Sequence, residues 1–184
     1  SLEKIEMDLP GFTIPKKPSS KDIKAFAKEF KGSKKPLLLV GHGAMIAGAS
    51  KEVKILAEKL NAPVTTTILG KGTFPESHKH SLGFLGMHGT AYANKAVEHC
   101  DLIVSIGSRW DDRITPANLE KFCPGAKKLH IDIDPAEINK IVMPDATLIG
   151  DAKDILKELI GYVEPLETTE WLKEVEKNKK KYPL

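Results

Sequence analysis

Two short, mainly apolar segments, residues 102–106 and 129–133, constrain the fold of this chain most strongly. Each has the length of a buried β-strand, and each ends in polar residues that include glycine or aspartate. In open parallel sheets, ligands bind beyond the carboxyl ends of the strands. The residues at the ends of these two segments are therefore candidate ligand contacts.

The remaining segments predict a doubly wound α/β fold. Residues 37–40 are an uninterrupted apolar run, which is typical of a strand covered on both faces, and residues 63–67 are rich in β-branched side chains. A brief strand is expected at 148–150, and an ordered loop at 76–86. Apolar spacing and capping residues predict helices at 20–30, 46–60, 92–100, 118–122, from 134 onward, and 151–162. Because single helices separate the strands, we expect a parallel sheet with helices on both faces.

The chain is long enough for one well-cored domain with an extension at each end. Residues 1–19 contain four prolines or glycines and are predicted to be a linker or extended arm. Residues 20–163 then form the domain, and residues 164–184 a C-terminal linker helix that begins at Thr168 or Thr169. This last helix has few apolar residues, so we expect it to dock outside the core or to lead into a further segment.

The charge balance disfavours nucleic acid and membranes as partners. The 28 basic and 25 acidic residues are scattered along the chain, with a net charge of +3, so no large surface of one sign is predicted. No stretch approaches the roughly 20 apolar residues of a membrane span, and the N-terminus lacks the pattern of a secretory signal. We therefore expect a soluble, cytoplasmic protein.

Cysteine and histidine spacing predicts no metal site. Cys100 and Cys123 form no Cys-x-x-Cys pair, which argues against a disulfide framework or a zinc site and indicates a reducing compartment. His78 and His80 have no third ligand at a suggestive spacing. A sirtuin-like deacetylase shares the predicted sheet type, but two cysteines cannot supply the four zinc ligands that it needs.

The turn Gly41-His42-Gly43 lies between a predicted strand and a predicted helix. At such a position, backbone amides and the helix dipole can bind a phosphate. Ile46 stands where the dinucleotide fingerprint has its third glycine, and residues 65–67 offer no acidic side chain for a ribose. The motif alone is equally typical of a tight turn, and a nicotinamide site is disfavoured.

Two further motifs allow a functional and a structural interpretation. Residues 86–89, Gly-Met-His-Gly, would let a ligand approach the backbone closely, although a lone histidine in a turn is more often structural. In residues 107–113, Arg109 could bind an anion through two guanidinium nitrogens, whereas alternating arginine and aspartate residues most often form ion pairs. The geometry of the folded chain distinguishes the two interpretations.

Acidic residues also stand at the ends of two later strands. Asp132, Asp134 and Asp151 suit ribose hydroxyls or an adenine amino group, and the alternative is that Asp134 and Asp151 cap helices. Together, the strand ends outline a crevice of the size of a nucleotide.

These residues form motifs that closely resemble one enzyme family. From about residue 33 to 160, the chain resembles the central domain of the large catalytic subunit of acetolactate synthases, also called acetohydroxyacid synthases, which are thiamine diphosphate enzymes. The motifs are GHGA at 41–44, TTTILGKGTFPESH at 65–78, LGMHGTAYAN at 85–94, IGSRWDDRIT at 106–115, KLHIDIDPAEINK at 128–140 and IGDAK at 149–153.

The resemblance implies a six-stranded parallel sheet with helices on both faces, a DHS-like FAD/NAD-binding fold that holds FAD in an extended pose. In this family the flavin is not needed for redox turnover and is usually viewed as structural. The flavin contacts implied by the family motifs are Gly41, His42, Gly43, Thr67, Ile68, Leu85, Gly86, Met87, His88, Gly107, Ser108, Arg109, Asp111, Asp132, Ile133, Asp151 and Ala152.

The resemblance also implies a role next to the substrate. Asp112 and Arg113 match a pair that faces the substrate channel in the family. The chain departs from the family at three positions, with Trp110 in place of the usual phenylalanine, Pro116 in place of glycine, and His42 in place of a frequent third glycine.

The whole enzyme of this family condenses two pyruvates, or pyruvate and 2-ketobutyrate, in branched-chain amino acid biosynthesis. Its catalytic glutamate belongs to a preceding pyrimidine-binding domain, and its Mg²⁺ and thiamine diphosphate motif to a following diphosphate-binding domain. This chain contains no Gly-Asp-Gly, so we expect no catalytic residue in it and no activity from it alone. The implied partners are those two domains, further copies of the full subunit and a small regulatory subunit.

Two other interpretations remain at this point. One is the central domain of another thiamine diphosphate enzyme, such as glyoxylate carboligase or pyruvate oxidase, although the Gly-Ser-Arg-Trp-Asp-Asp-Arg run favours acetolactate synthase. The other is a free-standing nucleotide-binding module without a surrounding enzyme.

Overall fold

The computed structural model describes residues 15–183, so residues 1–14 of the predicted arm lie outside it. Six strands form one sheet: β1 (Pro36–Val40), β2 (Val64–Thr66), β3 (Ser81–Phe84), β4 (Leu102–Ile106), β5 (Lys127–Asp132) and β6 (Ala146–Ile149). All neighbouring pairs are parallel, in the order β3-β2-β1-β4-β5-β6, which confirms the predicted fold class. The strand order changes direction between β1 and β4, where such sheets open a ligand crevice at their carboxyl ends.

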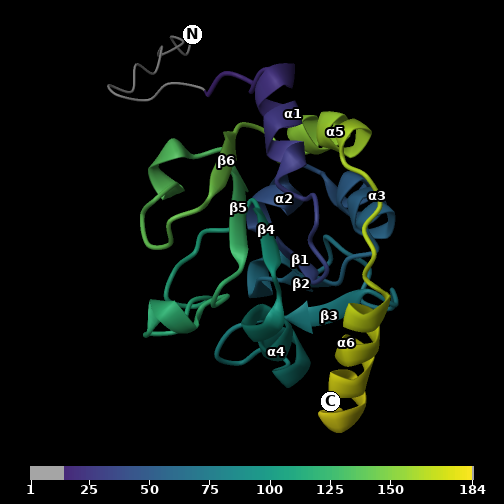
Figure 1. Cartoon of the computed structure of the whole chain (residues 1–184). Coiled ribbons are helices and arrows are strands. Elements are labelled where there is room, and N and C mark those ends of the chain that lie inside the picture. Colours follow the sequence, from purple (N-terminus) through teal and green to yellow (C-terminus); the bar gives the residue numbers. More distant parts are fainter. Residues whose placement is uncertain (1–14, 184) are drawn as a thin grey trace, which may run out of the picture.

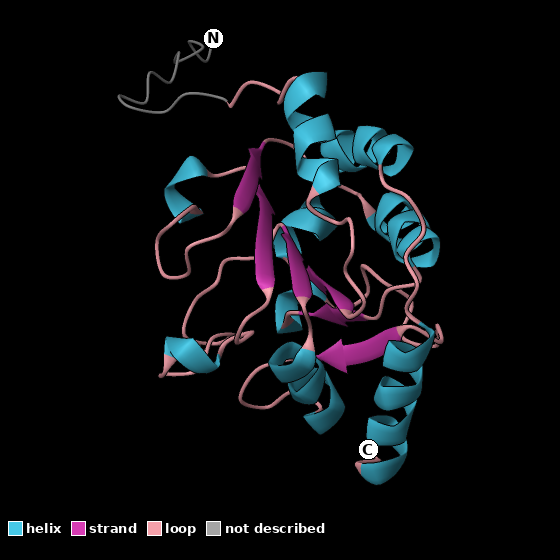
Figure 2. Cartoon of the chain, viewed as in Figure 1, coloured by secondary structure: helices cyan, strands magenta, loops and turns pink. Residues whose placement is uncertain are grey.

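Helices cover both faces of the sheet, as Figure 1 and Figure 2 show. One face carries α1 (Ser20–Lys28), α3 (Ser50–Leu60) and α5 (Ala152–Tyr162), and the other carries α4 (Ala91–His99) and α6 (Thr169–Lys181). Buried residues on each face form a separate hydrophobic cluster. The sheet is therefore the middle layer of three.

Strand β1 shows why its sequence is apolar without interruption. Leu38 and Val40 point into the cluster below α1, α3 and α5, whereas Leu37 and Leu39 point into the cluster on the α4 and α6 face. All four side chains are fully buried. A strand in the middle of a parallel sheet needs apolar residues on both faces, which is what residues 37–40 indicated.

The helix predicted over residues 46–60 is wrong at its start. The helical backbone begins directly after Gly41 with α2 (His42–Ile46), and α3 follows after a break at residues 47–49. Gly48 has a φ of +62°, a left-handed conformation that ends the first helix. The break separates a short helix at the crevice from a longer helix on the sheet.

The loop predicted at residues 76–86 contains a strand, β3. This strand has four residues, lies at the edge of the sheet and has an irregular register against β2, with Gly83 at a φ of +68°. Periodicity cannot reveal so short and irregular a strand.

Two predicted helices are single 3₁₀ turns, and a third such turn was not predicted. The turns are η1 (Ile68–Gly70), η2 (Leu119–Lys121) and η3 (Pro135–Glu137). Thus the connections from β4 to β5 and from β5 to β6 are loops with one 3₁₀ turn each, in place of the α-helices predicted at residues 118–122 and from residue 134 onward.

Helix α6 packs on this domain itself, contrary to the expectation that its apolar stripe is too narrow. Trp171 and Val175 are buried in the cluster of the α4 face, and the indole Nε1 of Trp171 donates to the carbonyl of Pro36 at 3.0 Å. Thr168 does not cap the helix with its side chain; its hydroxyl donates to the carbonyl of Asn61 at 2.8 Å. One large aromatic residue with a hydrogen bond is enough to dock the helix.

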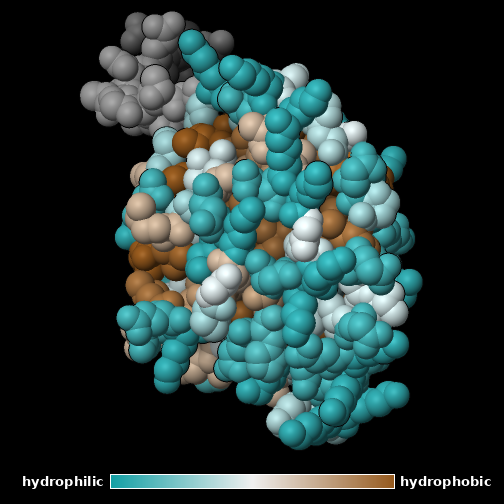
Figure 3. Space-filling view, in the orientation of Figure 1, coloured by the Kyte–Doolittle hydropathy of each residue, from teal (hydrophilic) through white to brown (hydrophobic). Residues whose placement is uncertain are grey.

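The outer surface on this side is strongly polar. Figure 3 shows hydrophilic side chains over most of the visible face, especially over α4 and α6, with hydrophobic surface mainly toward its left side and upper half. Among residues 15–183, no helix combines the length and the apolar character that crossing a membrane requires.

Candidate functional site

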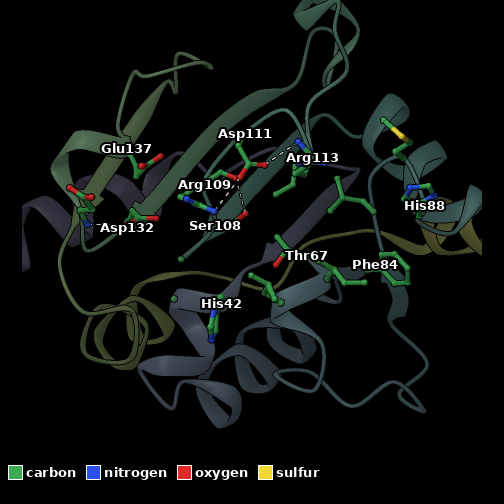
Figure 4. Close-up of a pocket in the computed structure, with 18 residues that line it drawn as sticks. His42, Thr67, Phe84, His88, Ser108, Arg109, Asp111, Arg113, Asp132 and Glu137 are labelled. Carbon is green, nitrogen blue, oxygen red and sulfur yellow. Dashed lines mark hydrogen bonds and ion pairs between the residues drawn. The ribbon is translucent and has the colours of Figure 1, made fainter.

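A crevice opens at the carboxyl ends of β1, β2, β4 and β5, with a volume of about 620 Å³. This volume lies within the usual range of small-molecule sites. The residues that line it are His42, Gly43, Thr67, Ile68, Leu69, Phe84, Leu85, Met87, His88, Gly107, Ser108, Arg109, Asp111, Arg113, Ile114, Asp132, Asp134 and Glu137. Figure 4 shows Asp132 and Glu137 at one end, Phe84 and His88 at the other, and Ser108 and Arg109 between them.

The ends of β1 and β4 approach each other closely because both carry glycine. The Gly41 amide donates to the carbonyl of Ile106, and the Gly43 amide to that of Gly107, each at 2.9 Å. A Cβ on Gly43 would lie 2.9 Å from the Cα of Gly107, and a Cβ on Gly41 would overlap the Gly107 carbonyl. These amides are already paired, so the motif joins two strand ends, and Gly41 does not line the crevice.

The β2 side of the crevice is apolar. Thr67 caps η1 by accepting from the amide of Gly70 at 3.0 Å, which leaves the side chains of Ile68 and Leu69 about 60% exposed at the crevice. Leu69 was not among the predicted contacts, although it stands next to two that were. Exposed aliphatic side chains at a cavity suit a flat apolar ring.

The motif at residues 86–89 forms a tight turn held by one side chain. Asn94 on α4 accepts from the amide of Gly86 and donates to its carbonyl, each at 3.0 Å. Gly86 has a φ of +108° and packs against the backbone of Arg113, so it shapes the turn without lining the crevice. Met87, which is 83% exposed, and His88 lie at the mouth.

The segment after β4 brings basic and acidic groups together. The guanidinium of Arg109 lies 3.4 Å from Asp111, and Asp111 also accepts from the amide of Arg113 at 3.1 Å. The structural interpretation of this motif is thus present, but the Arg109 side chain remains largely exposed at the crevice. Arg113 lines the crevice and lies 3.7 Å from Asp112, whose side chain is exposed and does not line the crevice.

The end of β5 supplies the acidic part of the crevice. Asp132 is buried, and its Oδ1 accepts from the amide of Asp134 at 3.0 Å. Asp134 caps η3 by accepting from Ala136 at 2.9 Å, and Glu137 lies 2.9 Å from Lys140. Asp134 and Glu137 nevertheless line the crevice, so Asp134 caps η3 and also presents an exposed carboxylate to the crevice.

Three predicted contacts at the ends of β5 and β6 do not line the crevice. Ile133 is exposed beside it, and Ala152 is buried in the first turn of α5. Asp151 caps that helix by accepting from Asp154 at 3.0 Å, as the structural interpretation required.

Several lining residues escaped sequence reasoning. Phe84 ends the unpredicted strand β3, Ile114 lies in the loop after β4, and Glu137 is the last residue of η3. Only the acidic cluster after β5 gave a local signal for Glu137.

The arrangement suits an elongated ligand with three unlike parts. Carboxylates at one end can accept hydrogen bonds from hydroxyl or amino groups, exposed guanidinium groups in the middle can bind phosphate oxygens, and apolar side chains at the other end can contact a ring. Within the described part of the chain, no group of three histidine, cysteine or acidic residues is arranged to hold a metal ion.

Comparison with known proteins decides the family. Residues 23–159 match the model of the central domain of thiamine pyrophosphate enzymes. The chain belongs to this family. The acetolactate synthase large subunit of Cyanidium caldarium is 45% identical to this chain over 174 residues, which cover 91% of this chain and 30% of that protein. Acetolactate synthase of Mycobacterium leprae is 41% identical over 185 residues, covering 97% of this chain and 29% of that protein.

A solved structure agrees with the sequence relatives. A protein from Mycobacterium smegmatis described as a thiamin diphosphate-dependent enzyme matches this chain with a TM-score of 0.68 and 28% identity, over 80% of this chain and 28% of that one. This chain thus spans about 30% of the length of the curated relatives named above. The family and fold predicted from the motifs are confirmed.

Proposed function

We propose that this central domain binds FAD in the crevice at the strand ends, as part of an acetolactate synthase large subunit. The observation that carries the proposal is the order of groups along the crevice, from Asp132 and Glu137 through Arg109 to Phe84. A ribose and adenine fit the acidic end, a diphosphate fits the guanidinium groups, and an isoalloxazine ring fits the apolar end.

The predicted contacts divide into two kinds under this proposal. Those that line the crevice would touch the flavin, whereas Gly41, Gly86, Ile133, Asp151 and Ala152 would act by shaping the turns and the helix start around it. Asp112 and Arg113 stand at the exposed side, where a substrate channel formed with another domain would face them.

The whole enzyme belongs to the same proposal. It would condense two pyruvates, or pyruvate and 2-ketobutyrate, with thiamine diphosphate and Mg²⁺ held by flanking domains, in a homo-oligomer with a regulatory subunit in the cytoplasm. The relatives named acetolactate synthase, at 45% and 41% identity, support this reading. Residues 1–19 and 164–184 would then lead to the flanking domains.

Titration of the chain with FAD, followed by flavin fluorescence and by heat, tests the proposal. We expect saturable binding at one site and a loss of affinity of roughly tenfold to a hundredfold in Arg109→Ala, the scale of a lost charged hydrogen bond. Lys173→Ala, which removes an exposed cation on α6, is the matched control and should bind as wild type. No binding by the folded chain, or equal binding by both variants, would contradict the proposal.

A further inference from the structure

His130 lies beneath the crevice without lining it. It belongs to β5, is fully buried, and pairs in register with Ser105 of β4. Its Nε2 lies 3.0 Å from the backbone carbonyl of Ser108, the residue that lines the crevice in the turn after β4. The imidazole therefore connects β5 to that turn from below.

The carbonyl oxygen determines which nitrogen of His130 carries a proton. A carbonyl can only accept, so Nε2 must donate, and in the neutral ring Nδ1 is then an acceptor. The hydroxyl of Ser105 donates to the same oxygen at 3.2 Å. Two side-chain donors thus converge on one carbonyl and hold the turn at Ser108 in place.

Trp110 restricts the imidazole from its face. The two rings are stacked, with centroids 4.5 Å apart and an interplanar angle of 24°, and Phe122 packs edge-on against the indole. Within residues 15–183, neither His130 Nδ1 nor Trp110 Nε1 has a hydrogen-bond partner, although both are buried. Burying unpartnered nitrogens costs stability, so a purely structural position would favour an apolar residue.

The same Nε2 lies 3.7 Å from Oδ2 of Asp132, and the other carboxylate oxygen is engaged by the amide of Asp134. His130 is thus in contact range of both Ser108, in the turn after β4, and Asp132, at the end of β5, and both of these residues line the crevice.

We propose that His130 is a positioning residue for the nucleotide site, which fixes the Ser108 turn relative to the Asp132 carboxylate through its Nε2 proton. The proposal rests on the proposed function, because the groups that it positions are the ones proposed to contact FAD. The stacked indole of Trp110 holds the His130 imidazole in the plane needed for its bond to the Ser108 carbonyl. Any flat aromatic residue at position 110 would do the same.

Two variants separate positioning from packing. His130→Leu fills the space without a donor, and His130→Gln restores an N–H near the position of Nε2. We expect FAD binding to weaken about tenfold in His130→Leu, as for one lost hydrogen bond, and to return to within about threefold of wild type in His130→Gln. Val175→Ala, a buried truncation on α6 away from the crevice, should lower stability and leave FAD binding unchanged.

The outcomes distinguish this proposal from the proposed function. Wild-type affinity in His130→Leu, or equal loss in both variants, would overturn the role of His130 while FAD binding by the wild type stood. No binding by the wild type would overturn the proposed function instead, and with it the ligand to be positioned. Nitrogen NMR of ¹⁵N-histidine-labelled wild type tests the geometry without variants: we expect His130 protonated on Nε2, and a proton on Nδ1 alone would overturn the proposal.

Discussion

At the scale of single residues, Gly107 joins the two strand ends that form the crevice. It has a φ of +59°, and a Cβ there would overlap the backbone amide of Ala44 and lie 2.7 Å from the carbonyl carbon of Gly43. Gly107→Ala should therefore lower the free energy of unfolding by about 2–3 kcal/mol, because neither the backbone conformation nor the space accepts a side chain. Urea denaturation measures this change.

Gly161 offers the matched control for that substitution. It lies in α5, and a Cβ there would meet no atom within 4 Å. Gly161→Ala should raise the free energy of unfolding by about 0.5–1 kcal/mol, since alanine is the better helix former. Similar effects of the two substitutions would contradict the close approach of β1 and β4.

His80 should make the fold sensitive to acid. Its burial, with the nearby positive charges of Lys79, His78 and Lys179, lowers its pKa from 6.5 to about 4. The unfolded chain therefore binds more protons at this residue between those two pH values, and the folded state loses stability as the pH falls from about 6.5 toward 4. In His80→Gln this part of the loss should vanish, as urea denaturation at several pH values would measure. A variant that kept the wild-type pH dependence would rule out this role for His80.

A residue of the crevice could be predicted from the sequence only when its neighbours in the chain formed a recognisable pattern. Gly43, Ser108, Arg109 and Asp132 line the crevice as expected, because a strand followed by a polar turn is visible in the sequence. His130 was not predicted, because its contacts with the carbonyl of Ser108 and with Trp110 exist only once β4 and β5 are paired, so no spacing in the chain reveals them.

At the scale of elements, α6 packs on the domain through the buried side chains of Trp171 and Val175. Trp171→Ala should lower the free energy of unfolding by about 3–5 kcal/mol, because it removes a buried aromatic side chain and leaves the carbonyl of Pro36 without its donor. Thermal or urea unfolding measures the change. Lys173→Ala, on the exposed side of the same helix, should change stability by at most about 0.5 kcal/mol. Equal effects would show that α6 does not dock through Trp171.

The elements also show where periodicity succeeds and fails. Strands β1 and β4 were predicted because both their faces are buried and their sequences are mainly apolar. Strand β3 was missed because it is short, lies at the edge and bends at Gly83. The docking of α6 was missed because its apolar residues are few, whereas two of them, Trp171 and Val175, are enough to bury one side of the helix in the cluster of the α4 face.

At the scale of the whole molecule, the sheet order places the crevice. The strand order changes direction between β1 and β4, so the loops after these two strands lead to opposite faces of the sheet. A crevice opens between the two loops, where residues from both can contact a ligand. The number of six parallel strands followed from the family resemblance, because β3 gave no clear strand period, whereas the order β3-β2-β1-β4-β5-β6 was not predicted and comes from the structure.

The most direct test of the central claim is a map of the backbone amides that respond to FAD. Spectra of the ¹⁵N-labelled chain, recorded during titration with FAD, should show the largest shifts at His42, Gly43, Gly107, Ser108 and Asp132, with the amides of α1 and α6 unchanged. Saturating FAD that moves none of these amides, or moves a cluster between α1 and β6 instead, would contradict a flavin site at the strand ends.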